Sequence, residues 1–349
     1  MHKQFLLAAL DQARLGRGMC SPNPSVGALA VQNDSIIAQA WHHGAGTPHA
    51  EPLLLTQFPE NTPGVTVYVT LEPCNHWGRT PPCVDAISRH GIQRIVYAYR
   101  DPNPIVSSNN TPQLLEKQGI EVLYYPLPEI DAFYQSYNHW MLTKKPWVTA
   151  KIAHTFDAKI AGADGEKLLL SNALCSDFTH IQRLHTDVIL TTARTINQDD
   201  PLFTARVAGV EQAKQIAILD TKLTLSPDSK VLSTAKHCHI YHDVALQSPP
   251  NDSRCSFYGI PTIKNRLDLH AVVCHLGSLG YHDVWVEAGG ELFSAFHQAE
   301  LVNRTYIYLV PKTLGETGIS AYRHGDVLKK ARAVHWQPMD DNMITRLDW

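Results

Sequence analysis

Four residues in the first half of the chain have the types and spacing that could build a zinc site. His49 and Glu51 flank one alanine, Cys74 follows a proline, and Cys83 follows two prolines. One imidazole and two thiolates suit tetrahedral zinc, and three protein ligands leave a fourth position for water. Bound zinc lowers the pKa of that water to about 7. Two buried thiols beside an unrelated histidine are the alternative, and spacing alone does not separate the two.

Glu51 is the candidate proton carrier for such a site. It lies two residues after His49, at an expected helix start where both side chains could reach one ion. A carboxylate there could take the proton of the water and later give it to a leaving amine. Cys83 also lies at an expected helix N-terminus, where the helix dipole favours a thiolate.

Helices and strands alternate in the first half, and they must position these residues. Apolar spacing predicts helices near residues 3–16, from Pro52 and from Cys83, and strands over 26–31, 36–40, 65–69 and 92–99, with another beginning at 119. A turn at Asn33-Asp34 joins the first two strands. Strand–helix–strand repeats of this spacing predict a sheet covered by helices.

A domain boundary is expected near residues 143–146, where an aromatic helical stretch ends and a new strand begins at Trp147. The second half is expected to alternate again, with strands over 147–152, 188–192, 215–220, 239–242, 284–287 and 305–310 and helices near 173–184 and 291–300. We therefore expect an α/β protein with domains at 1–144 and 145–349.

Composition excludes several classes of protein. The chain has 349 residues, 44% hydrophobic and 18% charged, with a formal net charge of −3. It has enough apolar material for two cores and no excess of positive charge for binding nucleic acid or an anionic membrane. No apolar run reaches the roughly 20 residues that span a bilayer. Seven cysteines without an export signal predict reduced thiols in a cytoplasmic protein.

The first half resembles a known enzyme family. A His-x-Glu followed by Pro-Cys and a second cysteine is the zinc-deaminase pattern, here with eight residues rather than two between the cysteines. That longer spacer resembles the RibD family, the bifunctional diaminohydroxyphosphoribosylaminopyrimidine deaminase / 5-amino-6-(5-phosphoribosylamino)uracil reductases of riboflavin biosynthesis. Further matching segments cover most of residues 1–144: Asn23-Pro24-Ser25-Val26-Gly27, His42, Gly46-Thr47-Pro48-His49-Ala50-Glu51, Thr70-Leu71-Glu72-Pro73-Cys74 and Asp101-Pro102-Asn103-Pro104.

The resemblance implies a cytidine-deaminase-like α/β/α sandwich that hydrolyses an exocyclic amine from a pyrimidine carrying a ribosylamino 5′-phosphate. It makes Glu51 the proton shuttle and gives one Zn²⁺ the ligands His49, Cys74 and Cys83. The residues implied to bind the deaminase substrate are Asn23 at the pyrimidine edge, His42, and, near the ribosyl phosphate, His76, Arg79 and Thr80. Asn75 stands where the family usually has serine.

The second half lacks the Gly-x-Gly-x-x-Gly of a Rossmann fold, but Glu287-Ala288-Gly289-Gly290 stands at an expected strand end. The order of its segments resembles the reductase half of the same family, which has a dihydrofolate-reductase-like α/β fold. That similarity implies NADPH-dependent reduction of the ribosylamino group to a ribitylamino group. The residues implied to bind the reductase substrate are Lys167, Arg183, Phe203, Arg206 and Glu287, with the two arginines as a phosphate clamp. Those implied to bind NADPH are Ala153, Leu169, Thr195, Asp199, Thr221, Gly289 and Gly290.

The second half also departs from the family pattern. Lys167-Leu168-Leu169 replaces a usual Ser-x-Trp, which removes an aromatic platform for the nicotinamide. The alternative to a bifunctional enzyme is therefore an active deaminase with a weak or degenerate reductase half. By resemblance we expect small-molecule substrates and a homodimer formed through the reductase half, with no nucleic-acid or membrane partner.

Overall fold

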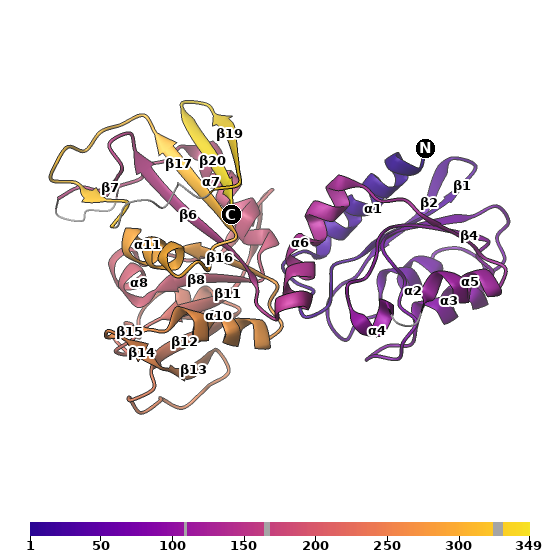
Figure 1. Ribbon diagram of the computed structural model, residues 1–349, viewed down its shortest axis with the longest axis horizontal. Coiled ribbons are helices and arrows are strands. Elements are labelled where there is room, and N and C mark those ends of the chain that lie inside the picture. Colours follow the sequence, from indigo (N-terminus) through magenta and orange to yellow (C-terminus); the bar gives the residue numbers. More distant parts are fainter. Residues whose placement is uncertain (108–109, 164–167, 324–330) are drawn as a thin grey trace. The chain divides into compact units, whose positions relative to one another are not determined.

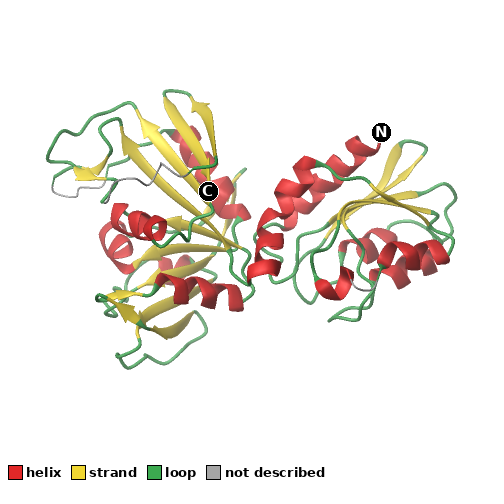
Figure 2. Ribbon diagram, in the orientation of Figure 1, coloured by secondary structure: helices red, strands yellow, loops and turns green. Residues whose placement is uncertain are grey.

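The computed structural model describes residues 1–107, 110–163, 168–323 and 331–349. Contacts between Cα atoms divide the chain into two units, Met1–Lys144 and Lys145–Trp349 (Figure 1). Each unit is an α/β structure with its own sheet (Figure 2). Within the described residues, no helix is both long and apolar enough to cross a membrane.

The first unit is built on a five-stranded sheet in the order β2-β1-β3-β4-β5. β1 pairs antiparallel with β2 and β3, whereas β3, β4 and β5 run parallel. Its strands are β1 (Gly27–Gln32), β2 (Ser35–Trp41), β3 (Thr66–Leu71), β4 (Arg94–Tyr99) and β5 (Glu121–Tyr124). Its helices are α1 (His2–Gly16), α2 (Ala50–Leu55), α3 (Cys83–His90), α4 (Pro104–Ser107), α5 (Thr111–Lys117) and α6 (Pro128–Thr143).

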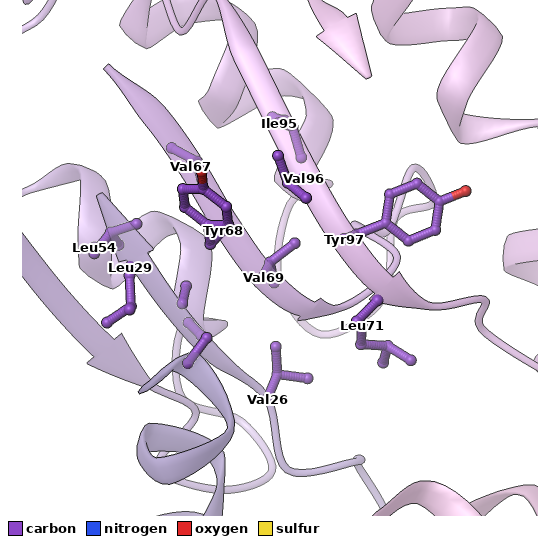
Figure 3. Packing of buried hydrophobic residues seen from close by; sticks show 14 of the residues in the cluster. Val26, Leu29, Leu54, Val67, Tyr68, Val69, Leu71, Ile95, Val96 and Tyr97 are labelled. Carbon is purple, nitrogen blue, oxygen red and sulfur yellow. The ribbon is translucent and has the colours of Figure 1, made fainter. Parts of the chain in front are cut away.

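Helices cover both faces of this sheet. α1 contacts α6 and the strands β1 and β3, while α2 packs on β1 and β2 and contacts α3. As a result β3 is buried on both sides: Val67 and Val69 point into the core shown in Figure 3, and Tyr68 and Thr70 are also buried. The alternation of valine with polar or aromatic residues in the sequence correctly predicts the strand, but the side chains on both of its faces are buried.

The second unit is built on a nine-stranded sheet in the order β13-β12-β11-β8-β16-β6-β17-β20-β19. The strands from β13 to β17 are parallel, and β20 and β19 add an antiparallel edge. These strands are β6 (Trp147–Thr155), β8 (Val188–Thr192), β11 (Gln215–Leu219), β12 (His237–Asp243), β13 (Cys255–Ile260), β16 (Asp283–Glu287), β17 (Arg304–Val310), β19 (Ala333–Met339) and β20 (Asn342–Asp348). Among the described residues, the other strands form three short pairs: β7 (Lys159–Ala161) with β18 (Ile319–Ser320), β9 (Ala205–Val207) with β10 (Val210–Gln212), and β14 (Thr262–Ile263) with β15 (Arg266–Leu267).

Two buried clusters lie on opposite faces of the large sheet. On β16, Val284 and Val286 belong to one cluster and Trp285 to the other, as the period of two in a strand requires. The first cluster takes side chains from α10 (Leu269–Ser278) and α11 (Gly290–Gln298). The second takes them from α7 (Ala173–His185), α8 (Ala193–Asp199) and α9 (Val231–Thr234).

Candidate functional site

The three predicted zinc ligands lie at the ends of neighbouring elements of the first unit. His49 is the N-cap residue of α2, Cys83 is the first residue of α3, and Cys74 follows β3 in a loop. The backbone N–H of Val84 donates to the carbonyl of Cys74 at 3.2 Å, which ties that loop to the first turn of α3. The two helix starts and the end of the strand therefore meet at one point.

The donor atoms of these residues fit a metal ion. His49 Nδ1 lies 3.2 Å from Cys83 Sγ and 3.5 Å from Cys74 Sγ, and the two sulfurs are 3.4 Å apart. Tetrahedral zinc, with bonds of roughly 2.0 Å to nitrogen and 2.3 Å to sulfur, separates such donors by roughly 3.5–3.8 Å. Within the described part of the chain, this is the one group of three or more His, Cys, Asp or Glu residues found close enough to hold an ion.

The electrostatics of the two thiols also favour a cation. Hydrogen bonding by Cys83, against the effect of burial, lowers the pKa of Cys74 to about 4, and the same contact together with burial raises the pKa of Cys83. Two thiolates in contact repel each other, so both ionise only when a positive ion lies between them. The donor set thus matches a soft divalent metal such as zinc.

Glu51 lies in the same site and is 4% exposed. Burial raises the pKa of its carboxyl group to about 7. A group with that pKa can both accept and release a proton near neutrality, as a proton shuttle requires.

A cavity of about 230 Å³ lies over these residues, and His49, Cys74 and Glu51 line it. All five side chains that the sequence assigns to the deaminase substrate line the same cavity: Asn23, His42, His76, Arg79 and Thr80. The structure therefore gathers the predicted substrate residues and the predicted metal site around one space.

His42 sets the orientation of Asn23. Its Nδ1 lies 3.1 Å from the carbonyl oxygen of Pro48, which can only accept, so this nitrogen carries the proton. Nε2 is then an acceptor and takes a hydrogen bond from Asn23 Nδ2 at 3.0 Å. Burial lowers the pKa of His42 and so favours this neutral form. The amide oxygen of Asn23 remains as the acceptor for a ligand.

Sequence reasoning assigned no role to two acidic residues of the cavity, Glu72 and Asp101. Glu72 directly follows β3 and Asp101 lies two residues after the end of β4, and the last residues of these parallel strands, Leu71 and Tyr99, pair with each other. Burial raises the pKa of Asp101 to about 6, although the carboxylate accepts hydrogen bonds from the Asn103 backbone and the Tyr137 hydroxyl. These two residues were predictable as site residues, because polar side chains at the carboxyl ends of adjacent parallel strands commonly line a binding site.

The second unit brings together a different set of predicted residues. Arg183 on α7 forms a two-pronged ion pair with Glu287 at the end of β16, with N–O distances of 2.6 and 2.7 Å. The ring of Phe203 is buried and lies 5.4 Å from the Arg183 guanidinium carbon. Arg206 lies close to Arg183, because both arginines donate to Thr204: Nη1 of Arg206 to its Oγ1, and Arg183 to its carbonyl oxygen.

The predicted cofactor residues lie on several elements of the second unit. Thr195 lies in the first turn of α8, where its N–H donates to Thr192, and Gly289 is the N-cap of α11. A Cβ added at Gly289 would meet nothing within 4 Å, whereas one at Gly290 would lie 2.3 Å from the carbonyl oxygen of Ala321. Gly289 therefore leaves room for a ligand, and Gly290 is required by packing.

The other predicted cofactor residues are more scattered. Ala153 is half-buried on β6, Asp199 ends α8, Thr221 follows β11 by two residues, and Leu169 is 87% exposed. Lys167, predicted to contact the reductase substrate, lies outside the described residues.

Known protein families match the two units separately. Residues 1–99 match the cytidine and deoxycytidylate deaminase zinc-binding region, and residues 146–345 match the RibD C-terminal domain. The riboflavin biosynthesis protein RibD of Aquifex aeolicus is 32% identical over 316 residues, which cover 90% of this chain and 88% of that protein. The chain belongs to the RibD family. RibD of Escherichia coli is also 32% identical, over 89% of this chain and 88% of its own length.

Solved structures lead to the same family. A RibD structure from Acinetobacter baumannii has a TM-score of 0.85 and 27% identity, covering 99% of this chain and 98% of that one. A diaminohydroxyphosphoribosylaminopyrimidine deaminase/5-amino-6-(5-phosphoribosylamino)uracil reductase from Thermotoga maritima has a TM-score of 0.86, with the same identity and coverage. The predicted two-domain α/β fold, with a zinc-binding deaminase half and a reductase half, is confirmed. This RibD-family chain is a bifunctional enzyme.

Proposed function

We propose that the first unit deaminates 2,5-diamino-6-(5-phosphoribosylamino)pyrimidin-4(3H)-one. We further propose that the second unit uses NADPH to reduce the ribosyl group of the product, 5-amino-6-(5-phosphoribosylamino)uracil, to a ribityl group. The activities named for the Thermotoga maritima relative support these substrates. The observation that carries the proposal is the single cavity lined by His49, Cys74 and Glu51 together with the five predicted substrate residues.

The chain's own residues would carry out the proton transfers of deamination. Zinc held by His49, Cys74 and Cys83 would supply a water of lowered pKa. Glu51 takes one proton from the attacking water and delivers it to the pyrimidine ring nitrogen as the C–O bond forms. It then carries the proton of the added hydroxyl group to the exocyclic amine, so that the C–N bond breaks, ammonia leaves and a carbonyl oxygen remains. Because Glu51 is enclosed and has a pKa of about 7, it can perform both halves of this transfer without a second carrier.

Other cavity residues would orient the substrate. The free amide oxygen of Asn23 accepts a hydrogen bond from the pyrimidine edge, in an orientation fixed by His42. Arg79, His76 and Thr80 offer cationic and hydroxyl donors to the ribosyl phosphate, a dianion that such donors recognise.

In the reductase half, NADPH would supply the hydride that adds to the sugar carbon of the ring-opened ribosylamine, while a proton adds to the nitrogen, and the residues of this unit would supply positioning and complementary charge. Glu287 would accept a hydrogen bond from a sugar hydroxyl. Arg206 would be the principal phosphate cation, because Arg183 already donates two hydrogen bonds to Glu287. The NADPH contacts proposed are those predicted from the sequence: Ala153, Leu169, Thr195, Asp199, Thr221, Gly289 and Gly290.

Replacing Glu51 by glutamine tests the deaminase assignment. We expect Glu51→Gln to keep its bound metal but to release ammonia at least about a hundredfold more slowly, since general acid–base catalysis contributes roughly 10²–10⁴-fold to the rate. Glu60→Gln, at an exposed position of the same unit, is the matched control and should retain full activity. Unchanged ammonia release in Glu51→Gln would overturn the proposed proton shuttle.

NADPH oxidation, followed at 340 nm with the deaminated pyrimidine, tests the reductase assignment. We expect oxidation that requires this substrate. A chain that releases ammonia but never oxidises NADPH would have a degenerate reductase half.

A further inference from the structure

Three donors hold the carboxylate of Glu287. Oε1 accepts from Arg183 Nε at 2.6 Å and from the Trp285 indole Nε1 at 2.7 Å, and Oε2 accepts from Arg183 Nη2 at 2.7 Å. An ionised carboxylate has about four lone-pair positions. The three contacts therefore leave one position, on Oε2, for a further donor.

The strand directs Trp285 toward this carboxylate. Trp285 and Glu287 are two residues apart on β16, so their side chains leave the sheet on the same face. Trp285 is 2% exposed, and its ring lies beside Tyr306, with 5.7 Å between ring centroids. A buried indole N–H needs an acceptor, and Glu287 Oε1 supplies it.

The surroundings of Glu287 hold more than one cation. Lys151 of β6 is the register partner of Glu287 across the two strands, and its side chain lies 4.8 Å from the centre of the Tyr308 ring. The side chains of Arg183 and Glu287 are only 13% and 12% exposed. In such a weakly screened site the carboxylate could rotate toward either cation. The indole N–H favours the rotamer in which Oε1 is doubly engaged and Oε2 stays open.

We propose that Trp285 is a positioning residue for the reduction: its indole N–H fixes the Glu287 carboxylate so that Oε2 is the acceptor for the sugar hydroxyl. Trp285 itself touches no substrate and acts through Glu287. This inference rests on the proposed function, in which Glu287 binds the sugar of the reductase substrate.

The test is Trp285→Phe in the full chain, which removes the N–H and keeps an aromatic ring. Trp349→Phe is the matched control, because the Trp349 indole donates to Thr305 Oγ1 at 2.9 Å in the same unit. For Trp285→Phe we expect kcat/KM for the phosphoribosyl substrate to fall about tenfold, equivalent to about 1.4 kcal/mol, mainly through kcat. The KM for NADPH and the release of ammonia by the first unit should not change. Trp349→Phe should keep the wild-type kcat.

Two results would overturn the inference. One is a wild-type kcat/KM in Trp285→Phe, and the other is an equal loss in Trp285→Phe and Trp349→Phe, which would indicate only a packing defect. If Trp285→Phe loses the unfolding transition of the second unit, Trp285→His, which keeps a ring N–H, is compared with Trp285→Leu. Higher kcat in the histidine variant supports the inference, and equal kcat overturns it.

Glu287→Gln separates this inference from the proposed function. Wild-type reduction in Glu287→Gln would overturn the role of Glu287 itself. Loss of reduction in Glu287→Gln combined with wild-type reduction in Trp285→Phe would overturn only the role of Trp285.

Discussion

Replacing Arg183 with methionine should strongly destabilise the second unit. Methionine keeps an unbranched side chain but removes the guanidinium, so the buried Glu287 carboxylate retains only the Trp285 N–H as a donor. Removing one partner of a buried ion pair typically costs about 3–5 kcal/mol. The pKa of Glu287 leads to a similar figure: burial raises it, but the charge and hydrogen bonds of Arg183 outweigh burial and lower it from 4.5 to about 2. At 1.36 kcal/mol per pKa unit, the net lowering, to which Lys151 and Trp285 also contribute, corresponds to about 3 kcal/mol.

Differential scanning calorimetry of the full chain measures this effect, with the transition of the first unit as an internal reference. For a unit of this size, 1 kcal/mol lowers Tm by about 2–4 °C, so Arg183→Met should lower Tm by roughly 6–20 °C. The matched control is Lys230→Met, which breaks the exposed ion pair between Lys230 and Asp200. Exposed pairs contribute about 0–1 kcal/mol, so this control should move Tm only slightly.

The effect of Arg183→Met should depend on pH. The folded pKa of Glu287 lies below its unfolded value, so the stabilisation by the ion pair is fully present above about pH 4.5 and is lost as pH falls toward 2. The difference in Tm between wild type and Arg183→Met should therefore shrink from pH 7 to pH 3.

The double variant Arg183→Met/Glu287→Leu removes both charges and should recover part of the lost stability. A Tm loss in Arg183→Met no larger than that of Lys230→Met would refute the reasoning, as would a double variant less stable than the single one.

Two further outcomes are expected. Cys74→Ser should lose its bound zinc, as measured by metal analysis, and should no longer release ammonia. Cys274→Ser, which replaces an exposed thiol, is the control and should keep both. A Cys74→Ser enzyme that stays active without metal would contradict the mechanism. Gly290→Ala should lower the Tm of the second unit, because its Cβ would lie 2.3 Å from the Ala321 carbonyl oxygen, and Gly289→Ala should change Tm little. Equal thermal shifts in the two glycine variants would count against the packing argument.

Local signals in the sequence located the elements that carry the zinc ligands. The helix predicted from Cys83 begins at that residue, and the turn predicted at Asn33-Asp34 has positive φ at both residues, as a tight hairpin turn requires. His49 and Cys83 were predictable because prolines and apolar periodicity mark helix starts within a few residues of them.

Elements without a strong local pattern were not predicted. Helix α10 is capped by Asp268, whose side chain accepts hydrogen bonds from the backbone N–H groups of His270 and Ala271, but its valines and histidines are weak helix formers. The first strand of the β19–β20 hairpin is mostly exposed and has no buried face of its own, and the hairpin joins the sheet through the pairing of β20 with β17.

Partners that come from distant parts of the chain could not be predicted either. Neither composition nor spacing indicates that Arg183 and Glu287 share a buried ion pair, because α7 and β16 meet only when the sheet is assembled. For the same reason, the contact between Tyr137 and Asp101 in the first unit had no signal in the sequence.

The strand order of the second unit has a consequence for how the protein is made. β6 is the first strand of that unit to leave the ribosome, yet it lies inside the sheet between β16 and β17, which are synthesised much later. Until those segments emerge, both edges of β6 offer unpaired backbone groups, and such edges promote aggregation. Nascent chains that stop before Asp283 should therefore depend on chaperones, and reductase activity should mature only after nearly the whole polypeptide has been released.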